Sequence, residues 1–236
     1  MFFLCQVYFI NFVVKPKNIM VKKIILCIVI ALSFNSLNAQ NGINFDGNND
    51  IIQTTYPGVL ASANRTFEAW VFVSSSAPSS NLAILDYGLN AVGSRNTFNV
   101  TGSRGINFIS GGTNANIGSS ANVVPVNQWV HAAFVLDNGI GYLYVNGVQV
   151  GTGSLSTVNT PAGNANVRIG QRVSGGSIPF HGSIDEVRIW NIARSSAEIS
   201  ANMNTELCTH PNLMAYYKFN QGTAGGSNTG LTTLID

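Results

Sequence analysis

Carboxylates are the first side chains to consider for chemistry, because two of them at a suitable separation can hydrolyse a glycosidic bond. Of the ten acidic residues in the chain, Asp185 and Glu186 are adjacent to each other within an apolar run. A catalytic pair must project from one face of a strand, which requires positions i and i+2. Adjacent residues of a regular strand project from opposite faces. The sequence therefore predicts that these two acids do not form a hydrolytic pair.

Histidine and cysteine give no stronger indication of catalysis. His131, His181 and His210 belong to no nucleophile motif, and His131 lies inside an apolar run, where a hydrogen-bonded core histidine is the simpler interpretation. Cys208 has no resolving cysteine and no signature context. We therefore expect that the protein is not an enzyme.

Aromatic residues are the usual platforms of sugar-binding sites, where amide and carboxylate groups surround them. The three tryptophans lie within apolar runs, which favours packing in the core instead. Two Gly/Asn-rich segments, 88–97 and 110–122, are an alternative contact surface, equally suited to a protein partner. The sequence alone does not select a sugar site. The candidates by residue type are Trp70, Trp129, Trp190, Tyr142, Tyr144, Tyr216 and Tyr217.

The N-terminal region has the pattern of an export leader. Lys22 and Lys23 precede a short apolar stretch, and the small residue Ala39 ends the segment. The apolar stretch is shorter than the roughly 20 residues that a spanning helix needs, although an uncleaved anchor is the alternative. We predict a signal peptide at 20–39 and an over-extended start at 1–19, upstream of Met20. The mature chain should then be secreted or displayed on the cell surface, without a membrane span.

The leader also accounts for the basic charge of the whole chain. It holds four basic residues and no acidic ones, whereas the rest of the chain has eight basic and ten acidic residues, a net charge of −2. An acidic chain without a basic stripe excludes nucleic acid as a favoured partner. Two of the three cysteines also lie in the leader, so Cys208 remains alone and no internal disulfide is expected in the mature chain.

Short alternating apolar runs separated by turn residues dominate residues 40–222 and indicate strands. Asn146-Gly147 between two such runs is a strong signal for a hairpin, because both turn residues need positive φ. Ser195 and Glu198 form a capping box that predicts one short helix, with Ile199 and Met203 on its packed side. An all-β sandwich follows from this pattern. The strands are expected at 66–73, 129–136, 141–150, 167–170, 184–190 and 215–219, with loops at 74–81, 110–122, 153–164 and 173–179.

Five blocks of the sequence, in register, resemble the laminin-G-like (LamG) domains of the concanavalin A-like lectin/glucanase superfamily, in the form common in bacterial secreted and surface proteins. This resemblance implies a jelly roll of two antiparallel sheets in which the first and last strands are neighbours. It covers nearly the whole mature chain. The blocks are INFDGNNDIIQ (43–53), RTFEAWVFV (65–73), QWVHAAFVLDNGIGYLYVNGVQV (128–150), FHGSIDEVRIWNIARSSAEISANM (180–203) and AYYKFNQG (215–222).

The resemblance also implies a structural Ca²⁺ near the opening turn, since this ion binds carboxylate, amide and carbonyl oxygens. Asp46 and Asp50 provide such oxygens in an Asn-containing turn, and Asp185 would complete the site from the later strand. The alternative is that Asp46 only stabilises the turn.

The expected function is therefore a non-catalytic binding or adhesion module that recognises carbohydrate or a cell-surface protein. The alternative is an accessory domain or fragment of a larger secreted glycoside hydrolase or multi-domain adhesin. Residues 223–236 are interpreted as the start of a truncated following segment.

Overall fold

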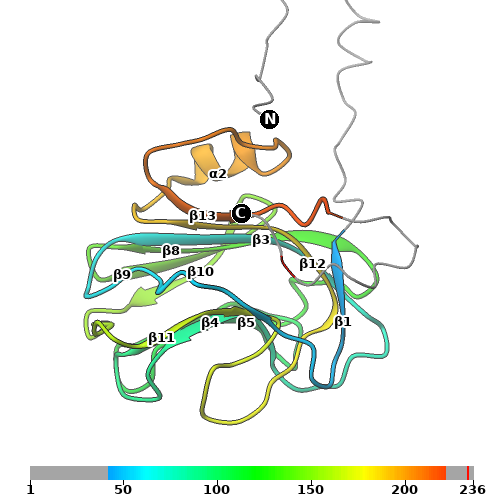
Figure 1. Cartoon of the computed structure of the whole chain (residues 1–236), viewed down its shortest axis with the longest axis horizontal. Helices are drawn as coiled ribbons and strands as arrows, with labels where there is room; N and C mark the ends of the chain where they lie inside the picture. Colours follow the sequence, from blue (N-terminus) through cyan, green and yellow to red (C-terminus); the bar gives the residue numbers. More distant parts are fainter. Residues whose placement is uncertain (1–41, 222–232, 234–236) are drawn as a thin grey trace, which may run out of the picture.

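The computed structural model of the chain describes residues 42–221 and residue 233. The predicted leader and almost all of segment 223–236 lie outside the described residues. The all-β jelly-roll prediction is confirmed, because two antiparallel sheets pack face to face in a sandwich (Figure 1). One sheet, here called the helix-side sheet, has the short helix α2 over its outer face (Figure 1). The other is here called the pocket-side sheet.

The helix-side sheet contains most of the strands that the sequence predicted. Its strand order is β1-β12-β3-β8-β9-β10, and β13 also pairs with β12. The bounds are β1 Ile43–Asp46, β3 Arg65–Val73, β8 Trp129–Asp137, β9 Ile140–Val145, β10 Val148–Ser154, β12 His181–Trp190 and β13 Leu213–Tyr217.

The pocket-side sheet has the strand order β2-β11-β4-β5-β6-β7. Five of its six strands were not predicted, and one of these, β7, lies inside a segment that was expected to be a loop. The bounds are β2 Ile52–Gln53, β4 Leu82–Gly88, β5 Arg95–Val100, β6 Ile106–Ile109, β7 Asn116–Gly118 and β11 Ala165–Ile169.

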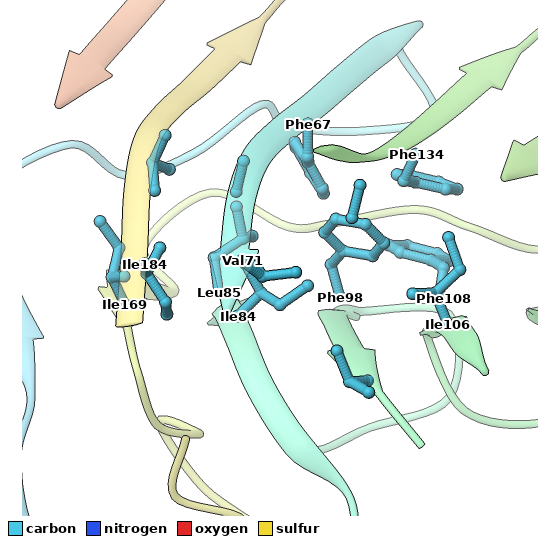
Figure 2. Packing of buried hydrophobic residues seen from close by; sticks show 14 of the residues in the cluster. Phe67, Val71, Ile84, Leu85, Phe98, Ile106, Phe108, Phe134, Ile169 and Ile184 are labelled. Atoms are coloured by element: carbon cyan, nitrogen blue, oxygen red, sulfur yellow. The ribbon is translucent and has the colours of Figure 1, made fainter. Parts of the chain in front are cut away.

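The core lies between the two sheets and is rich in phenylalanine. On β3, Phe67, Ala69 and Val71 are fully buried and point inward, as the alternation of this strand predicted. Figure 2 shows Phe67 and Phe134 of the helix-side sheet facing Phe98 and Phe108 of the other. The rings of Phe108 and Phe134 stack with centroids 3.9 Å apart. Aromatic contacts of this kind join the two sheets into one core.

The local turn and cap predictions are confirmed. Asn146 and Gly147 have φ values of 48° and 78° and connect β9 to β10 as a two-residue turn. Helix α2 spans Ser196–Asn202, with Ser195 as its N-cap and Glu198 completing the capping box. Ile199 is buried beneath it, while Met203 is the C-cap residue and is half-buried.

The two ends of the domain lie along one edge of β12 but do not pair with each other. β1 pairs with residues 181–184 of β12, and β13 pairs with residues 187–190. The first and last strands are therefore neighbours only end to end along β12, and they do not lie side by side. β12 pairs with both strands through different parts of its length.

Candidate functional site

The outer face of the pocket-side sheet is polar, and part of it is covered by the segment 171–179. Along β5, Phe98 and Val100 enter the core, so Arg95, Thr97 and Asn99 project outward. The covering segment bonds to this face through its backbone: the amide of Val173 donates to Asp86 Oδ2 at 2.8 Å. Thr97 donates its hydroxyl to Asp86 Oδ1. Burial raises the pKa of the Asp86 carboxyl.

A pocket of about 230 Å³ opens beside this covered region. Its floor includes Arg95 at the start of β5 and Ser110 just after β6. The antiparallel pairing of β5 with β6 brings these residues together, because Thr97 lies opposite Ile109. The complete lining is Asn90, Ala91, Val92, Arg95, Ser110 and Gly111.

Two buried polar atoms at the pocket have no hydrogen-bond partner among the described residues: Arg95 Nε and Ser110 Oγ. Arg95 is 8 % exposed, and its Nη2 donates to Asn90 Oδ1 and to the carbonyl of Ser174. Val92 is 72 % exposed and gives the pocket an apolar rim. The pocket therefore combines a cation, an amide, a hydroxyl and an apolar edge, with hydrogen-bonding capacity to spare.

None of the seven aromatic candidates lines this pocket. Trp190 is buried and lies under the Arg194 guanidinium, as expected of a packed residue. Trp70 and Trp129 are half-buried on the outer face of the helix-side sheet, where Trp70 donates to the carbonyl of Met203. The tyrosines 142, 144, 216 and 217 also lie in the helix-side sheet.

The signal for the pocket in the sequence was the pair of Gly/Asn-rich segments. Asn90 and Arg95 fall within 88–97, and Ser110 falls within 110–122. The individual residues were not singled out, because only the pairing of β5 with β6 shows that the two segments meet.

The prediction that Asp185 and Glu186 face opposite ways is wrong. In the register of β12 with β3, Asp185 lies opposite Trp70 and Arg188 lies opposite Glu68. β12 therefore has one more residue than β3 between these positions, which is a β-bulge, and Glu186 within it has a φ of 51°. Ile184 and Val187 both enter the core, which leaves the two acids between them on the outer face. Glu186 accepts hydrogen bonds from Arg188 and Tyr216.

Asp185 is buried, with 3 % of its surface exposed, whereas Glu186 is only half-buried. Burial, and then the charge of Glu186, raise the pKa of Asp185 to about 7. Its Oδ1 accepts the amide of Glu186 at 3.0 Å. Neither acid lines the pocket, which lies on the outer face of the other sheet.

The predicted calcium ligands do not form one cluster. Asp46 ends β1 and Asp50 lies in the turn that follows, where Asp50 Oδ2 accepts the amide of Asp46 and Asp46 Oδ1 accepts that of Asn48, both at 2.8 Å. In the pairing of β1 with β12, Asp46 lies opposite His181. His181 is four residues before Asp185 on β12. That spacing corresponds to ~13 Å, too far for one ion. Within the described residues, no group of three or more His, Cys, Asp or Glu side chains could hold a metal.

Beneath helix α2 lies a separate buried polar cluster. Glu68 accepts from Arg194 at 2.7 Å and lies 3.4 Å from His131 Nε2, and these side chains are almost completely buried. Arg188 and Arg194 also donate to Asn202 at the end of α2. These contacts attach the helix to the sheet. In the part of the chain that the structure describes, no helix has the length and apolar character needed to cross a membrane.

Comparisons with solved structures find the same fold in several proteins. A candidate carbohydrate-binding protein from Bacteroides ovatus is 23% identical with a TM-score of 0.61, covering 76% of this chain and 52% of its own. The chain thus spans about half of that protein. The CBM40 of the Ruminococcus gnavus IT-sialidase, bound to α2,3 sialyllactose, is 18% identical with a TM-score of 0.54, covering 71% of this chain and 98% of its own.

A heptameric SAP-like pentraxin from Limulus polyphemus is 16% identical with a TM-score of 0.52, covering 69% of this chain and 82% of its own. At these identities the likeness establishes the fold. A search of the curated proteins found no match to the chain. The Laminin_G_3 family, described as the concanavalin A-like lectin/glucanases superfamily, matches residues 46–200, which is more than half of the chain. The chain therefore belongs to this family of the concanavalin A-like lectin/glucanases superfamily.

Proposed function

We propose that this protein is a non-catalytic carbohydrate-binding domain, exported to the cell surface or beyond, and that the pocket beside Arg95 and Ser110 holds a sugar unit. The observation that carries the proposal is the chemistry of this pocket. Its lining offers a guanidinium, an amide, a hydroxyl and an apolar rim within about 230 Å³.

Sugar rings match this combination of groups. Their hydroxyls both donate and accept, so they can satisfy Arg95 Nε and Ser110 Oγ, which have no partner among the described residues. Their C–H faces can pack on Val92. The pocket is smaller than the ~300–1,000 Å³ of typical small-molecule sites, which suits one unit of a longer glycan.

The comparisons support carbohydrate binding, but they do not identify the sugar. The family is described by its lectins and glucanases. The Bacteroides ovatus neighbour is titled a candidate carbohydrate-binding protein, and the Ruminococcus gnavus neighbour contains sialyllactose. A protein partner at the cell surface is the second candidate, supported by the exposed apolar residues Leu89 and Val92.

The arrangement of the acids supports a binding role over hydrolysis. The pocket lining contains no carboxylate, whereas glycoside hydrolysis in most families needs two at the scissile bond. Asp185 and Glu186 share a face, but Asp185 is buried and Glu186 is engaged with Arg188 and Tyr216.

A glycan array with the purified protein tests the proposal. We expect binding to a subset of plant, algal or host glycans, and we expect Ser110→Ala and Asn90→Ala each to weaken it about tenfold, the effect of ~1.4 kcal/mol. Ser110→Ala should leave the melting temperature unchanged, since Ser110 Oγ has no partner to lose among the described residues. Ser196→Ala, on the exposed side of α2, is the matched control and should bind like the wild type. No binding to any glycan would refute the proposal and favour the protein partner.

A further inference from the structure

The buried arginines of this protein differ in how their charge is accommodated. Arg65 is completely buried, and its Nε, Nη1 and Nη2 all donate to carbonyl or side-chain oxygens. Arg188 and Arg194 are buried against the carboxylates of Glu186 and Glu68. Arg188 Nε has no hydrogen-bond partner among the described residues, but the charge of Arg188 is paired with Glu186.

Arg95 is the exception at the pocket. Its Nη2 donates to Asn90 and Ser174, but its Nε has no partner, and no ion pair joins Arg95 to a carboxylate within the described residues. Burying a cation without a counter-charge is costly, so such residues are normally paired.

The neighbouring groups supply only part of the missing charge. Burial raises the pKa of Asp86, and the charges of Arg95 and Arg172 partly offset this, so Asp86 interacts with both guanidiniums. Asp86 lies on the adjacent strand, but its two oxygens accept from the Thr97 hydroxyl and the Val173 amide. Arg172 adds a second cation: burial and the charge of Arg95 lower its pKa, and its Nε also has no partner among the described residues. Two guanidiniums therefore share this region with one buried carboxyl group.

We propose that the pocket recognises an acidic sugar, and that Arg95 binds the sugar carboxylate. This inference rests on the proposed function and names its ligand class. A planar guanidinium matches the two oxygens of a carboxylate, and the charged hydrogen bond is stronger than one to a hydroxyl. Ser110 and Asn90 are placed to bond ring hydroxyls beside it.

Matched pairs of ligands test the charge directly by isothermal titration calorimetry. The first pair is trigalacturonic acid and its methyl ester, which differ in charge but share the sugar skeleton. The second pair is sialyllactose and lactose, which separates a sialic acid source from a uronic acid source. We expect at least one acid to bind tenfold or more tightly than its neutral counterpart, and the preference to weaken as salt increases.

Two variants assign the preference to Arg95. Arg95→Gln should reduce the preference to within about twofold. Lys218→Gln removes one positive charge just after β13, at the helix-side sheet, and should leave the preference intact. The wild-type comparison decides the charge question even if Arg95→Gln does not fold. Equal binding of acid and neutral forms would overturn the inference and leave the carbohydrate proposal standing. An acid preference that survives in a folded Arg95→Gln variant would refute the role of Arg95. A blank glycan array would refute both.

Discussion

Glu68 is fully buried on the outer face of β3, between Arg194 and His131. Burial alone would raise its pKa, but the hydrogen bond and charge of His131 and the charges of Arg194 and Arg188 lower it to about 2. A carboxyl with a lowered pKa stabilises the fold above its unfolded value of 4.5 and loses that effect as the pH falls toward 2.

Glu68→Gln should therefore destabilise the protein at pH 7. Removing one partner leaves Arg194 buried and uncompensated, which costs ~3–5 kcal/mol of unfolding free energy. Urea denaturation measures the loss. Glu206→Gln breaks the exposed pair with Lys218 and should cost less than ~1 kcal/mol. Similar losses in the two variants would contradict the buried-pair argument.

Asp185 should show the opposite pH dependence. Because burial and Glu186 raise its pKa from 3.8 to about 7, the folded state favours the neutral acid. The stability contribution is complete below pH 3.8 and is lost as the pH rises to about 7. Asp185→Asn should match the wild type at pH 4 and be more stable at pH 8, by up to ~4 kcal/mol. Thermal melts at both pH values check this, and a less stable variant at pH 8 would mean that a bound cation compensates the carboxylate.

The same residue shows where sequence reasoning reaches its limit. The alternation rule assigned Asp185 and Glu186 to opposite faces because it assumes an unbroken strand. The bulge places a non-glycine residue, Glu186, at a φ of 51°, so no glycine marked the position. Arg188, two residues along the same strand, and Tyr216, 30 residues away on β13, both donate to Glu186, and the contact with Tyr216 is not local in the sequence.

At the scale of elements, the β9–β10 turn packs against helix α2. A Cβ on Gly147 would lie 2.2 Å from Ser200 Oγ, and the φ of Gly147 is positive. Gly147→Ala should cost ~1–2 kcal/mol for the backbone conformation and more for the contact with Ser200. Gly163 has a similar φ, but a Cβ there would have nothing within 4 Å. Gly163→Ala therefore isolates the backbone cost, and chemical denaturation should show the larger loss in Gly147→Ala. Equal losses would show that the helix moves away freely.

Calcium binding at the turn after β1 stays a prediction for Asp46 and Asp50 alone. We expect millimolar calcium to raise the melting temperature, since extracellular modules bind the ion at ~10⁻⁴–10⁻³ M. Asp50→Asn should remove the shift, with Asp137→Asn, at the end of β8, as the control. An unchanged melting temperature in the wild type would leave both carboxylates as stabilisers of the turn, the role that their bonds to Asp46 N and Asn48 N already describe.

Sequence patterns predicted the helix-side sheet much better than the pocket-side sheet. Strands such as β8 have apolar residues on both faces, so their runs are unmistakable. In contrast, β5 reads RNTFNV, and its outward residues Arg95, Thr97 and Asn99 resemble a loop. These polar side chains are nevertheless buried. The segment 171–179 bonds to this face through Val173, and that burial comes from distant parts of the chain.

At the scale of the whole molecule, the two layers divide the tasks of the fold. The helix-side sheet pairs its buried Arg188 with Glu186 and its Glu68 with Arg194, whereas Arg95 of the pocket-side sheet has no ion pair among the described residues, and its Nε has no hydrogen-bond partner there. The sequence predicted the sandwich and the resemblance predicted its topology, but the pocket depends on two segments that only the β5–β6 pairing brings together.

The core that joins the layers should make the sandwich unfold as one unit. Phe134 on β8 stacks on Phe108 at 3.9 Å and also contacts Phe67 and Phe98, so it touches both sheets. Phe134→Ala should cost ~3–5 kcal/mol, because it removes a buried ring and leaves a cavity. Phe72→Ala, at a half-buried outer position, should cost clearly less. Because the core is continuous, circular dichroism and tryptophan fluorescence should report one coincident transition in each variant. Separate transitions would show that the helix-side sheet keeps its fold without the pocket-side sheet.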